Sequence, residues 1–300
     1  MDKLLLLGGH GFLGSHILSK LIDLNYEIHV VGRNSSEDSQ EDYIFHNINL
    51  CSISDVQKKL PSNFQYIINV SGSIDHSNYF YGGKAIFESH FLAVKNIIDH
   101  IDRSHLKKFI QIGSSDEYGS SQKDTNESLV CEPFSPYSLG KLFASNFISY
   151  LGKYEDFPGL TFRPFLFYGN GQKLDRFLPS LISACIANKK FDLSPGEQIR
   201  DFCHVKDIVD AILISLDIDL PLGEIINLGS GDGISIKEMV LKVQELVGAG
   251  KPSFGSLSYR EGENMHLVAN TNKAFELLGW KPEISLEDGL VKTIQYYKNE

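Results

Sequence analysis

The stretch that decides the fold is Lys3–Leu18, KLLLLGGHGFLGSHIL, which contains a short apolar strand, a glycine-rich turn and the start of a helix. Gly8, Gly11 and Gly14 give it the spacing GxxGxxG. Glycine allows a tight turn and a close approach of the backbone to a pyrophosphate, whose charge then lies at the N-terminus of the following helix. Because it directly follows the first strand, this pattern predicts a dinucleotide-phosphate site rather than a purely structural turn.

The rest of the first half of the chain alternates β-rich runs with helical stretches. Continuous apolar strands separated by helices indicate a parallel sheet covered by helices on both faces. We therefore expect an α/β fold with a doubly wound parallel sheet of the Rossmann type. The expected strands are Lys3–Leu7, Glu27–Val31, Tyr43–Asn47, Tyr66–Val70, Lys108–Ile112 and Leu160–Leu166, and the expected helices are Phe12–Leu24, Ile53–Leu60, Ala85–Ile101 and Tyr137–Leu151.

The pattern loosens after Gly169 into mixed helices, short strands and turns rich in proline and glycine, such as SPGEQ and GAGKPSFG. This change predicts a Rossmann domain over residues 1–169. Residues 170–300 are expected to form mainly a smaller mixed α/β lobe that binds substrate, with some segments returning to the Rossmann sheet.

Composition excludes several classes of function. The formal charge of −10 and the pI near 5.5 argue against a surface for nucleic acid or anionic membrane. The four cysteines lie far apart without a CxxC pair, as in a cytosolic protein with reduced thiols. No apolar run approaches the roughly 20 residues of a membrane span. The ten histidines form no HxH or HExxH pair. We expect a cytoplasmic protein without a metal site.

The end of the second expected strand bears on the choice of cofactor. Rossmann proteins that prefer NAD usually have a carboxylate here that accepts the ribose 2′-hydroxyl. This chain has Gly32, Arg33 and Asn34 instead. A guanidinium can pair with a 2′-phosphate in two places, whereas a carboxylate would repel it. The sequence therefore favours NADP(H) over NAD(H). The alternative is that Arg33 stacks on the adenine, which suits either cofactor.

The segment SPYSLGKLFAS places Tyr137 and Lys141 four residues apart on an expected helix. At that spacing both side chains lie on one helical face. A cationic lysine near a phenol lowers its pKa from about 10 toward the range useful for acid–base catalysis. Tyr-x-x-x-Lys alone is weak evidence, but it gains weight beside the glycine turn and a strand, Lys108–Ile112, that runs into Ser114.

Together these motifs make the chain resemble, over nearly its whole length, an extended short-chain dehydrogenase/reductase of the nucleotide-sugar epimerase/dehydratase type. Several motifs in the right order are far more specific than any one of them. The matches are GxxGxxG at Gly8–Gly14, Ser-Ser-x-x-Tyr-Gly at Ser114–Gly119, Tyr-x-x-x-Lys at Tyr137–Lys141, RPFLFYG at Arg163–Gly169, RDFCHVKDIVDAI at Arg200–Ile212, NLGSGDGISI at Asn227–Ile236, and YREGE followed by LGWKPEISLEDGL.

The resemblance implies roles for individual residues. Ser114 would hydrogen-bond the reacting sugar oxygen, Tyr137 would carry the proton, and Lys141 would hold the nicotinamide ribose. The implied cofactor-binding residues are Gly8, Gly11, Phe12, Leu13, Gly14, Arg33, Asn34, Asn49, Leu50, Val70, Ser71, Gly72, Tyr137, Lys141 and Pro164. The implied substrate-binding residues are Ser115, Asp116, Arg200 and Arg260, of which the two arginines would contact the diphosphate and ribose of a nucleotide sugar.

The chain also departs from the family pattern at two positions. Leu166 stands where the family often has an asparagine near the diphosphate, and Asn49-Leu50 replaces the usual Asp-Leu that reaches the adenine. These differences affect contacts with the nucleotides and leave the catalytic trio unchanged.

The acids after the fifth strand bear on the reaction. Asp116 lies three residues before the motif glycine, where family dehydratases have the acid that removes a proton next to the ketone. The alternative is that Asp116 and Glu117 cap the turn or contact a substrate hydroxyl. The chain is short for a 4,6-dehydratase, and its later motifs resemble 4-ketoreductases of the CDP-abequose synthase type.

We therefore favour NADPH-dependent reduction of the 4-keto group of an NDP-4-keto-6-deoxyhexose in the synthesis of deoxysugars for surface polysaccharides. Asp116 would then be dispensable. The alternatives are an NAD(P)-dependent 4-epimerase or 4,6-dehydratase on the same scaffold. A non-catalytic, cofactor-sensing binding protein is a further alternative, although such proteins commonly lose the tyrosine or the lysine.

Aromatic side chains recur at helical spacing on two expected helices, at Phe87, Phe91, Phe143 and Phe147. Core packing explains such a pattern, but helices in these positions form a four-helix dimer interface in the family that the chain resembles. We therefore expect a homodimer.

Overall fold

The computed structural model describes residues 1–33, 42–120, 125–259 and 262–299. Asn34 and Arg260, two of the predicted ligand-binding residues, lie outside these ranges. The chain divides into two compact units. Unit 1 comprises Met1–Gly119, Val130–Arg163 and Val209–Ile226, and unit 2 comprises Ser120–Leu129, Pro164–Ile208 and Asn227–Glu300.

A seven-stranded sheet with the order β10-β6-β5-β4-β1-β2-β3 forms the centre of unit 1. The strand pairs from β6 to β3 are parallel, so the predicted Rossmann-like α/β fold is confirmed. Its strands are β1 (Asp2–Leu7), β2 (Tyr26–Gly32), β3 (Ile44–Asn47), β4 (Tyr66–Asn69), β5 (Lys108–Ile112), β6 (Gly159–Pro164) and β10 (Glu224–Leu228).

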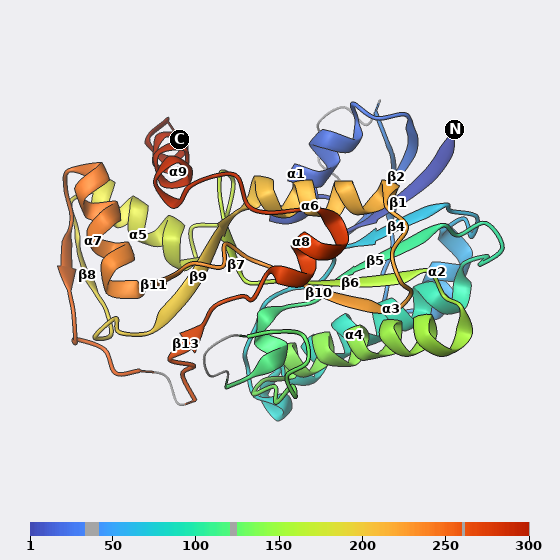
Figure 1. The fold of residues 1–300 in the computed structure, drawn as a ribbon, viewed down its shortest axis with the longest axis horizontal. Coiled ribbons are helices and arrows are strands. Elements are labelled where there is room, and N and C mark those ends of the chain that lie inside the picture. Colours follow the sequence, from blue (N-terminus) through green and yellow to red (C-terminus); the bar gives the residue numbers. More distant parts are fainter. Residues whose placement is uncertain (34–41, 121–124, 260–261, 300) are drawn as a thin grey trace. The chain divides into compact units, whose positions relative to one another are not determined.

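Helices cover both faces of this sheet. Figure 1 shows α3 (Gly83–His100) and α4 (Pro136–Glu155) side by side below the strands, with α1 (Phe12–Leu21) on the opposite side. Alternate residues of β1 point to the two faces, and Leu5 and Leu7 belong to a buried cluster with residues of α3 and α4. The remaining helical segments are α2 (Ile53–Lys59), the 3₁₀ turns η1 (Tyr79–Tyr81) and η2 (Ser115–Tyr118), and α6 (Val205–Asp217).

Unit 2 is a mixed α/β structure with its own buried cluster. A small sheet has β9 between β11 and β13, with β7 also paired to β9, and β8 pairs separately with β12. Its strands are β7 (Leu166–Tyr168), β8 (Lys190–Asp192), β9 (Ile199–His204), β11 (Gly233–Ser235), β12 (Lys251–Ser253) and β13 (His266–Leu267), and its helices are α5 (Phe177–Ile186), α7 (Ile236–Val247), α8 (Asn272–Leu278) and α9 (Leu286–Asn299).

The prediction of a single strand over Leu160–Leu166 is wrong at its end. β6 stops at Pro164 in the seven-stranded sheet, and Leu166 opens β7, which pairs with β9. Phe165 still donates its N–H to the carbonyl of Leu228 on β10 at 2.8 Å, so the chain changes sheet between Phe165 and Leu166.

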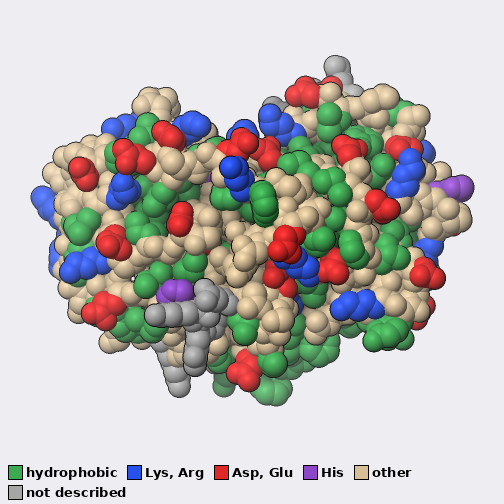
Figure 2. Space-filling view, in the orientation of Figure 1, with side chains coloured by type: hydrophobic (Ala, Val, Ile, Leu, Met, Phe, Trp, Pro, Cys, Tyr) green, Lys and Arg blue, Asp and Glu red, His purple; other side chains and the backbone are tan. Residues whose placement is uncertain are grey.

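Acidic and basic side chains are interspersed on the face drawn in Figure 2, so the described residues in that view form no broad area of one charge. None of the described helices is both long enough and apolar enough to span a bilayer.

Candidate active site

The glycine turn after β1 folds as its sequence predicts. The N–H of Gly8 donates to the carbonyl of Val31 at 2.8 Å, and the N–H of Gly11 donates to the carbonyl of Gly8 at 2.9 Å. Gly8 has a φ of +83°, a left-handed conformation that favours glycine. A Cβ added at Gly14 would lie 2.2 Å from the carbonyl oxygen of Gly8. The first turn of α1 therefore rests directly on backbone, and only glycine permits this contact.

A pocket of about 540 Å³ opens over this turn, entirely within unit 1. Residues at the ends of β1, β2, β3 and β4 line it, and the N-terminus of α1 supplies N–H groups suited to a phosphate. These features fit the adenosine and pyrophosphate of a dinucleotide cofactor. The pocket brings together eight of the predicted cofactor residues, Gly8, Gly11, Arg33, Asn49, Leu50, Val70, Ser71 and Gly72.

Other predicted cofactor residues do not line this pocket. Phe12, Leu13 and Gly14 form the first turn of α1. Pro164 is the last residue of β6 and belongs to unit 2. The sequence reasoning missed one wall of the pocket, formed by α3. Ala85, Ser89 and Ala93 line it at intervals of four residues, and this run of small side chains along one helical face was a usable signal.

Arg33 is an exposed residue that lines the pocket directly after β2. Its charge favours the thiolate of Cys51, another residue of the pocket wall, although burial raises the pKa of that thiol overall. The guanidinium is therefore close enough to the pocket to influence its electrostatics.

The polar strand end after β5 is a capped 3₁₀ turn. The N–H of Asp116 donates to Oγ of Ser114 at 3.1 Å, and the N–H of Ser114 donates to Oε1 of Glu117 at 2.8 Å. This reciprocal pair is a capping box. The hypothesis that the acids cap the turn is thus confirmed for Glu117. Asp116 is half-buried, and Ser115 is buried at 3% exposure.

A second capping box starts α4. Ser135 and Ser138 exchange hydrogen bonds between side chain and backbone, and Pro136 occupies the first helical position. These residues fix the start of the helix, so Tyr137 lies in its first turn and Lys141 one turn later. Both side chains are buried at 5% exposure.

Lys141 is bound to the strand that carries the turn. Its Nζ donates to the carbonyl of Ile112 at 2.7 Å, two residues before Ser114. Burial lowers the pKa of Lys141 to about 8, and the negative charge of Glu117 opposes part of that effect. The lysine is thus held cationic near neutral pH in a site where its charge acts strongly on neighbouring groups.

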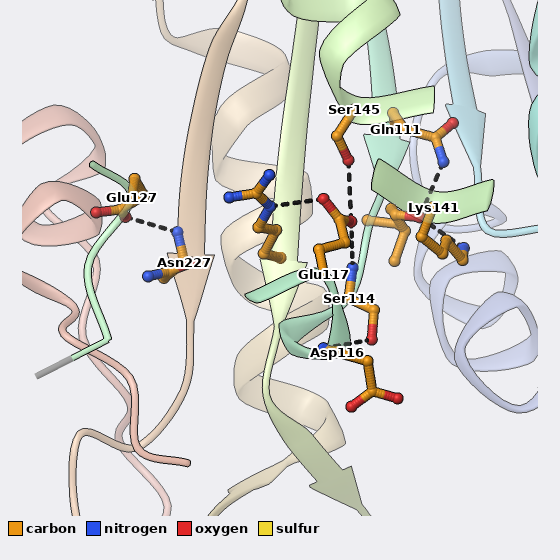
Figure 3. A network of polar contacts seen from close by, with 10 residues as sticks. Gln111, Ser114, Asp116, Glu117, Glu127, Lys141, Ser145 and Asn227 are labelled. Carbon is orange, nitrogen blue, oxygen red and sulfur yellow. Dashed lines mark hydrogen bonds and ion pairs between the residues drawn. The ribbon is translucent and has the colours of Figure 1, made fainter. Parts of the chain in front are cut away.

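The same carbonyl connects the lysine with the cofactor pocket. Nε2 of Gln111 also donates to Ile112 O at 2.9 Å, and Oε1 of Gln111 accepts from Asn69 at 2.8 Å. Oδ1 of Asn69 in turn accepts from both N and Oγ of Ser71, which lines the pocket. A continuous network therefore runs from the pocket wall to Lys141. Figure 3 shows the part of it around Gln111 and Lys141.

Two histidine rings contact the ring of Tyr137. The centroid of His90 lies 5.0 Å away and that of His76 lies 5.4 Å away, both edge-on. Burial, with the nearby charge of Lys141, lowers the pKa of His90 to about 3, so this ring is neutral. A neutral ring can pack against Tyr137 without adding a second cation beside Lys141.

The sequence reasoning missed a buried ion pair at the turn Ser115–Tyr118. Oε2 of Glu117 accepts from Nε of Arg163 at 2.7 Å, and both side chains are buried, at 0% and 2% exposure. Arg163 lies on β6, and its guanidinium also lies over the ring of Tyr118. Although burial disfavours the charged guanidinium, Glu117 and Tyr118 raise the pKa of Arg163.

The predicted substrate residue Arg200 belongs to unit 2, on β9. Its guanidinium forms an ion pair with Glu263 and donates to the carbonyl of Ile199 at 2.8 Å. Within the described residues, no cluster of three His, Cys, Asp or Glu side chains has a geometry that could hold a metal ion.

The model of the NAD dependent epimerase/dehydratase family matches residues 4–229. UDP-glucuronate 4-epimerase of Thermodesulfobacterium geofontis is 31% identical over 218 residues, 70% of this chain and 65% of that protein. The mouse (Mus musculus) dTDP-D-glucose 4,6-dehydratase is 26% identical over 335 residues, 99% of this chain and 88% of that protein.

A solved structure shares the fold over the whole chain. The UDP-glucuronic acid 4-epimerase of Bacillus cereus, in complex with UDP-glucuronic acid and NAD, superposes with a TM-score of 0.87 at 23% identity and covers 99% of both chains. At this identity, the similarity establishes the common fold.

Proposed function

The chain belongs to the NAD dependent epimerase/dehydratase family, and within it we propose an enzyme that reduces the 4-keto group of an NDP-4-keto-6-deoxyhexose with NADPH. The observation that carries the chemistry is the pairing of Tyr137 and Lys141 on α4 with the Ser114 turn. Lys141 connects the two through its bond to the carbonyl of Ile112, and Ser71 connects the same network to the pocket. Lys141 and the pocket wall are thus joined by one hydrogen-bonded network, and Ser114 lies two residues after the carbonyl of Ile112 that this network shares.

The proposed roles follow from the chemistry of the side chains. The nicotinamide, when bound, supplies the hydride for the sugar carbon. Oγ of Ser114 hydrogen-bonds the reacting sugar oxygen, and Tyr137 donates a proton to that oxygen as its charge develops. Cationic Lys141 stabilises the phenolate left on Tyr137 and so brings the phenol pKa toward neutrality.

Arg33 supports NADP(H) as the cofactor. It follows β2 directly, lines the pocket and carries a charge that can pair with a 2′-phosphate. The solved relative named above holds NAD. That precedent supports NAD(H) as the alternative, with Arg33 against the adenine.

A second reaction deserves testing because the relatives include a 4-epimerase and a 4,6-dehydratase. Both of these reactions begin in the direction opposite to the reductase, because hydride leaves C4 of the sugar for the oxidised nicotinamide and Tyr137 accepts the proton of the C4 hydroxyl. Asp116 supports dehydration in particular, because this half-buried carboxylate belongs to the catalytic turn and its own N–H binds Ser114 Oγ. In the reductase, Asp116 contacts substrate or is dispensable.

The substrate class and assembly complete the proposal. The relative's UDP-glucuronic acid ligand supports a nucleotide sugar, with Arg200 and Arg260 at its diphosphate and ribose and Ser115 near the sugar. We also expect a cytoplasmic homodimer. The helix pair α3 and α4 supports this, because Phe143, Tyr150 and Tyr154 are 45%, 52% and 75% exposed on α4.

The test is the absorbance at 340 nm of NADPH mixed with purified protein and CDP- or dTDP-4-keto-6-deoxyglucose. Loss of NADPH in proportion to substrate supports the reductase. Interconversion of UDP-sugars without net loss of cofactor would favour the epimerase, and release of water from an NDP-hexose would favour the dehydratase. The variant Tyr137→Phe removes the proposed proton carrier and should abolish any of these activities.

A further inference from the structure

Glu117 is the buried group that the proposed chemistry leaves unused. Its side chain has 0% exposure, and its two oxygens accept three hydrogen bonds from three different elements. Oε1 accepts from the N–H of Ser114 and from Oγ of Ser145 on α4, at 2.8 and 2.9 Å, while Oε2 accepts from Arg163 on β6 at 2.7 Å. Figure 3 shows Glu117 with Ser114 and Ser145.

The position of Glu117 relates it to both proposed catalytic side chains. Tyr137, Lys141 and Ser145 follow one another at intervals of four residues along one face of α4. By binding Ser145 and Ser114 through a single oxygen, Glu117 joins that helical face to the catalytic turn. The close fit is visible at Gly113, where an added Cβ would lie 2.4 Å from Oε1 of Glu117.

A contribution to the stability of the fold does not by itself explain why Glu117 and Arg163 form a buried ion pair. Taking two charges out of water costs several kcal/mol for each ion, and apolar residues of similar volume often serve a fold equally well or better. A carboxylate at this point does something that an apolar side chain cannot do, since it adds a negative charge to the surroundings of Lys141 and accepts the N–H of Ser114.

We propose that Glu117 is a positioning residue of this active site, which fixes the Ser114 turn against the face of α4 that carries Tyr137 and Lys141. The proposal rests on the proposed function, because Ser114, Tyr137 and Lys141 take their roles from it. Glu117 itself does not contact the reacting atoms, so its effect passes through Ser114 and Lys141. The negative charge of Glu117 also raises the pKa of Lys141, which burial lowers, and so helps to keep Lys141 cationic.

The first test variant is Glu117→Gln, which keeps the shape of the side chain and removes its charge. It leaves the buried guanidinium of Arg163 without its anion, so the double variant Glu117→Gln/Arg163→Met, which buries no unpaired charge, is prepared beside it. Asp99→Asn is the matched control, because it removes one carboxylate from an exposed i,i+4 pair on α3.

The first measurement needs no substrate or cofactor. The pKa of Lys141 is read from the ε-carbon signal of labelled lysine, assigned with Lys141→Arg. We expect titration near pH 8 in the wild type, as the structure implies, and at a pH lower by about one unit in the double variant. An unchanged titration in a folded double variant would overturn the influence of Glu117 on Lys141.

The second measurement follows the enzyme across pH with its nucleotide sugar. In both Glu117 variants, kcat should fall about tenfold or more at neutral pH. The alkaline limb of the profile should move to lower pH together with Lys141. KM should change little, because Glu117 touches no ligand. If only KM changed, or if kcat fell while the alkaline limb stayed at the same pH, the proposal would be wrong and Glu117 would have only a structural role in its ion pair.

Ser145→Ala covers the case in which the charge variants do not fold. It removes one donor to Oε1 and leaves both buried charges in place. A lost hydrogen bond of about 1 kcal/mol predicts a decrease in kcat of about fivefold, and an unchanged kcat would contradict the positioning role. If the wild type turned over no nucleotide sugar while the titration of Lys141 still moved, the proposed function would fail and the link between Glu117 and Lys141 would stand.

Discussion

Gly14→Ala should destabilise the protein and weaken binding of the cofactor, because the new side chain would collide with the glycine turn. The new Cβ would lie 2.2 Å from the carbonyl oxygen of Gly8 and 2.8 Å from Cα of Gly9. Ordinary contact begins near 3.4 Å, so the first separation is more than 1 Å too short. Both neighbours are backbone atoms, which cannot rotate away as a flexible side chain could. The first turn of α1 must therefore move away from the glycine turn.

Two opposing effects set the size of the change. Alanine favours a helix interior over glycine by about 1 kcal/mol, whereas overpacking a closely fitted site costs about 1–3 kcal/mol. Because the clash is with backbone atoms, we expect a cost at the upper end of this range, so the free energy of unfolding should fall by about 2 kcal/mol. The displaced helical turn follows Gly11 directly and borders the pocket, so affinity for the dinucleotide should weaken about tenfold or more.

Urea unfolding measures the first effect and titration with NADPH the second. Ser19→Ala is the control, because it lies exposed on the same helix and should change stability by less than about 0.5 kcal/mol. A Gly14→Ala protein as stable as the wild type, with undiminished affinity for NADPH, would refute the close contact between α1 and the glycine turn.

Three further predictions follow from the same structure. Arg33→Ala should weaken NADPH binding by about tenfold and leave NADH binding nearly unchanged at fixed salt, whereas equal losses for both would place Arg33 against the adenine. Lys141→Met should abolish turnover while the free energy of unfolding at pH 7 stays level or rises. In the folded wild type, the pKa of Lys141 is about 8, below its usual value of 10.5. Between pH 8 and 10.5 the unfolded chain therefore binds more protons than the folded protein, so the free energy of unfolding of the wild type should increase with pH over that range. The variant should lack that increase, and a wild type without it would contradict the lowered pKa. Sedimentation at micromolar concentration should give about twice the chain mass of 33.6 kDa, and a mass near 33.6 kDa would rule out the homodimer.

Local patterns made the first half of the fold predictable. The apolar run before Gly8 and the glycine spacing through Gly14 specify β1, the turn and α1, because each of these depends on neighbouring residues. The break between β6 and β7 was not predicted. Whether Leu166 stays in the first sheet or joins β9 depends on residues beyond position 198, and an apolar run does not reveal its partner strand.

Local sequence patterns also predicted part of the candidate site. Tyr137 and Lys141 share a helical face by their spacing alone, and the structure places them there. Glu117 was expected to cap its turn, but its burial depends on Arg163, 46 residues away. An acid in a loop is usually solvated, so its local sequence gives no sign of a distant cation. Polar residues inside apolar strands, Gln111 and Arg163, were the signal that a buried network exists.

The most direct test of the account follows the hydride itself. NADPH deuterated at the transferring position of the nicotinamide is incubated with the protein and an NDP-4-keto-6-deoxyhexose, and the sugar product is examined by mass spectrometry and NMR. The proposed reaction should place one deuterium at C4 of the sugar for each NADPH consumed, and none when Tyr137→Phe replaces the wild type. A product without deuterium at C4, or deuterium transfer that persists in Tyr137→Phe, would contradict the proposed reaction.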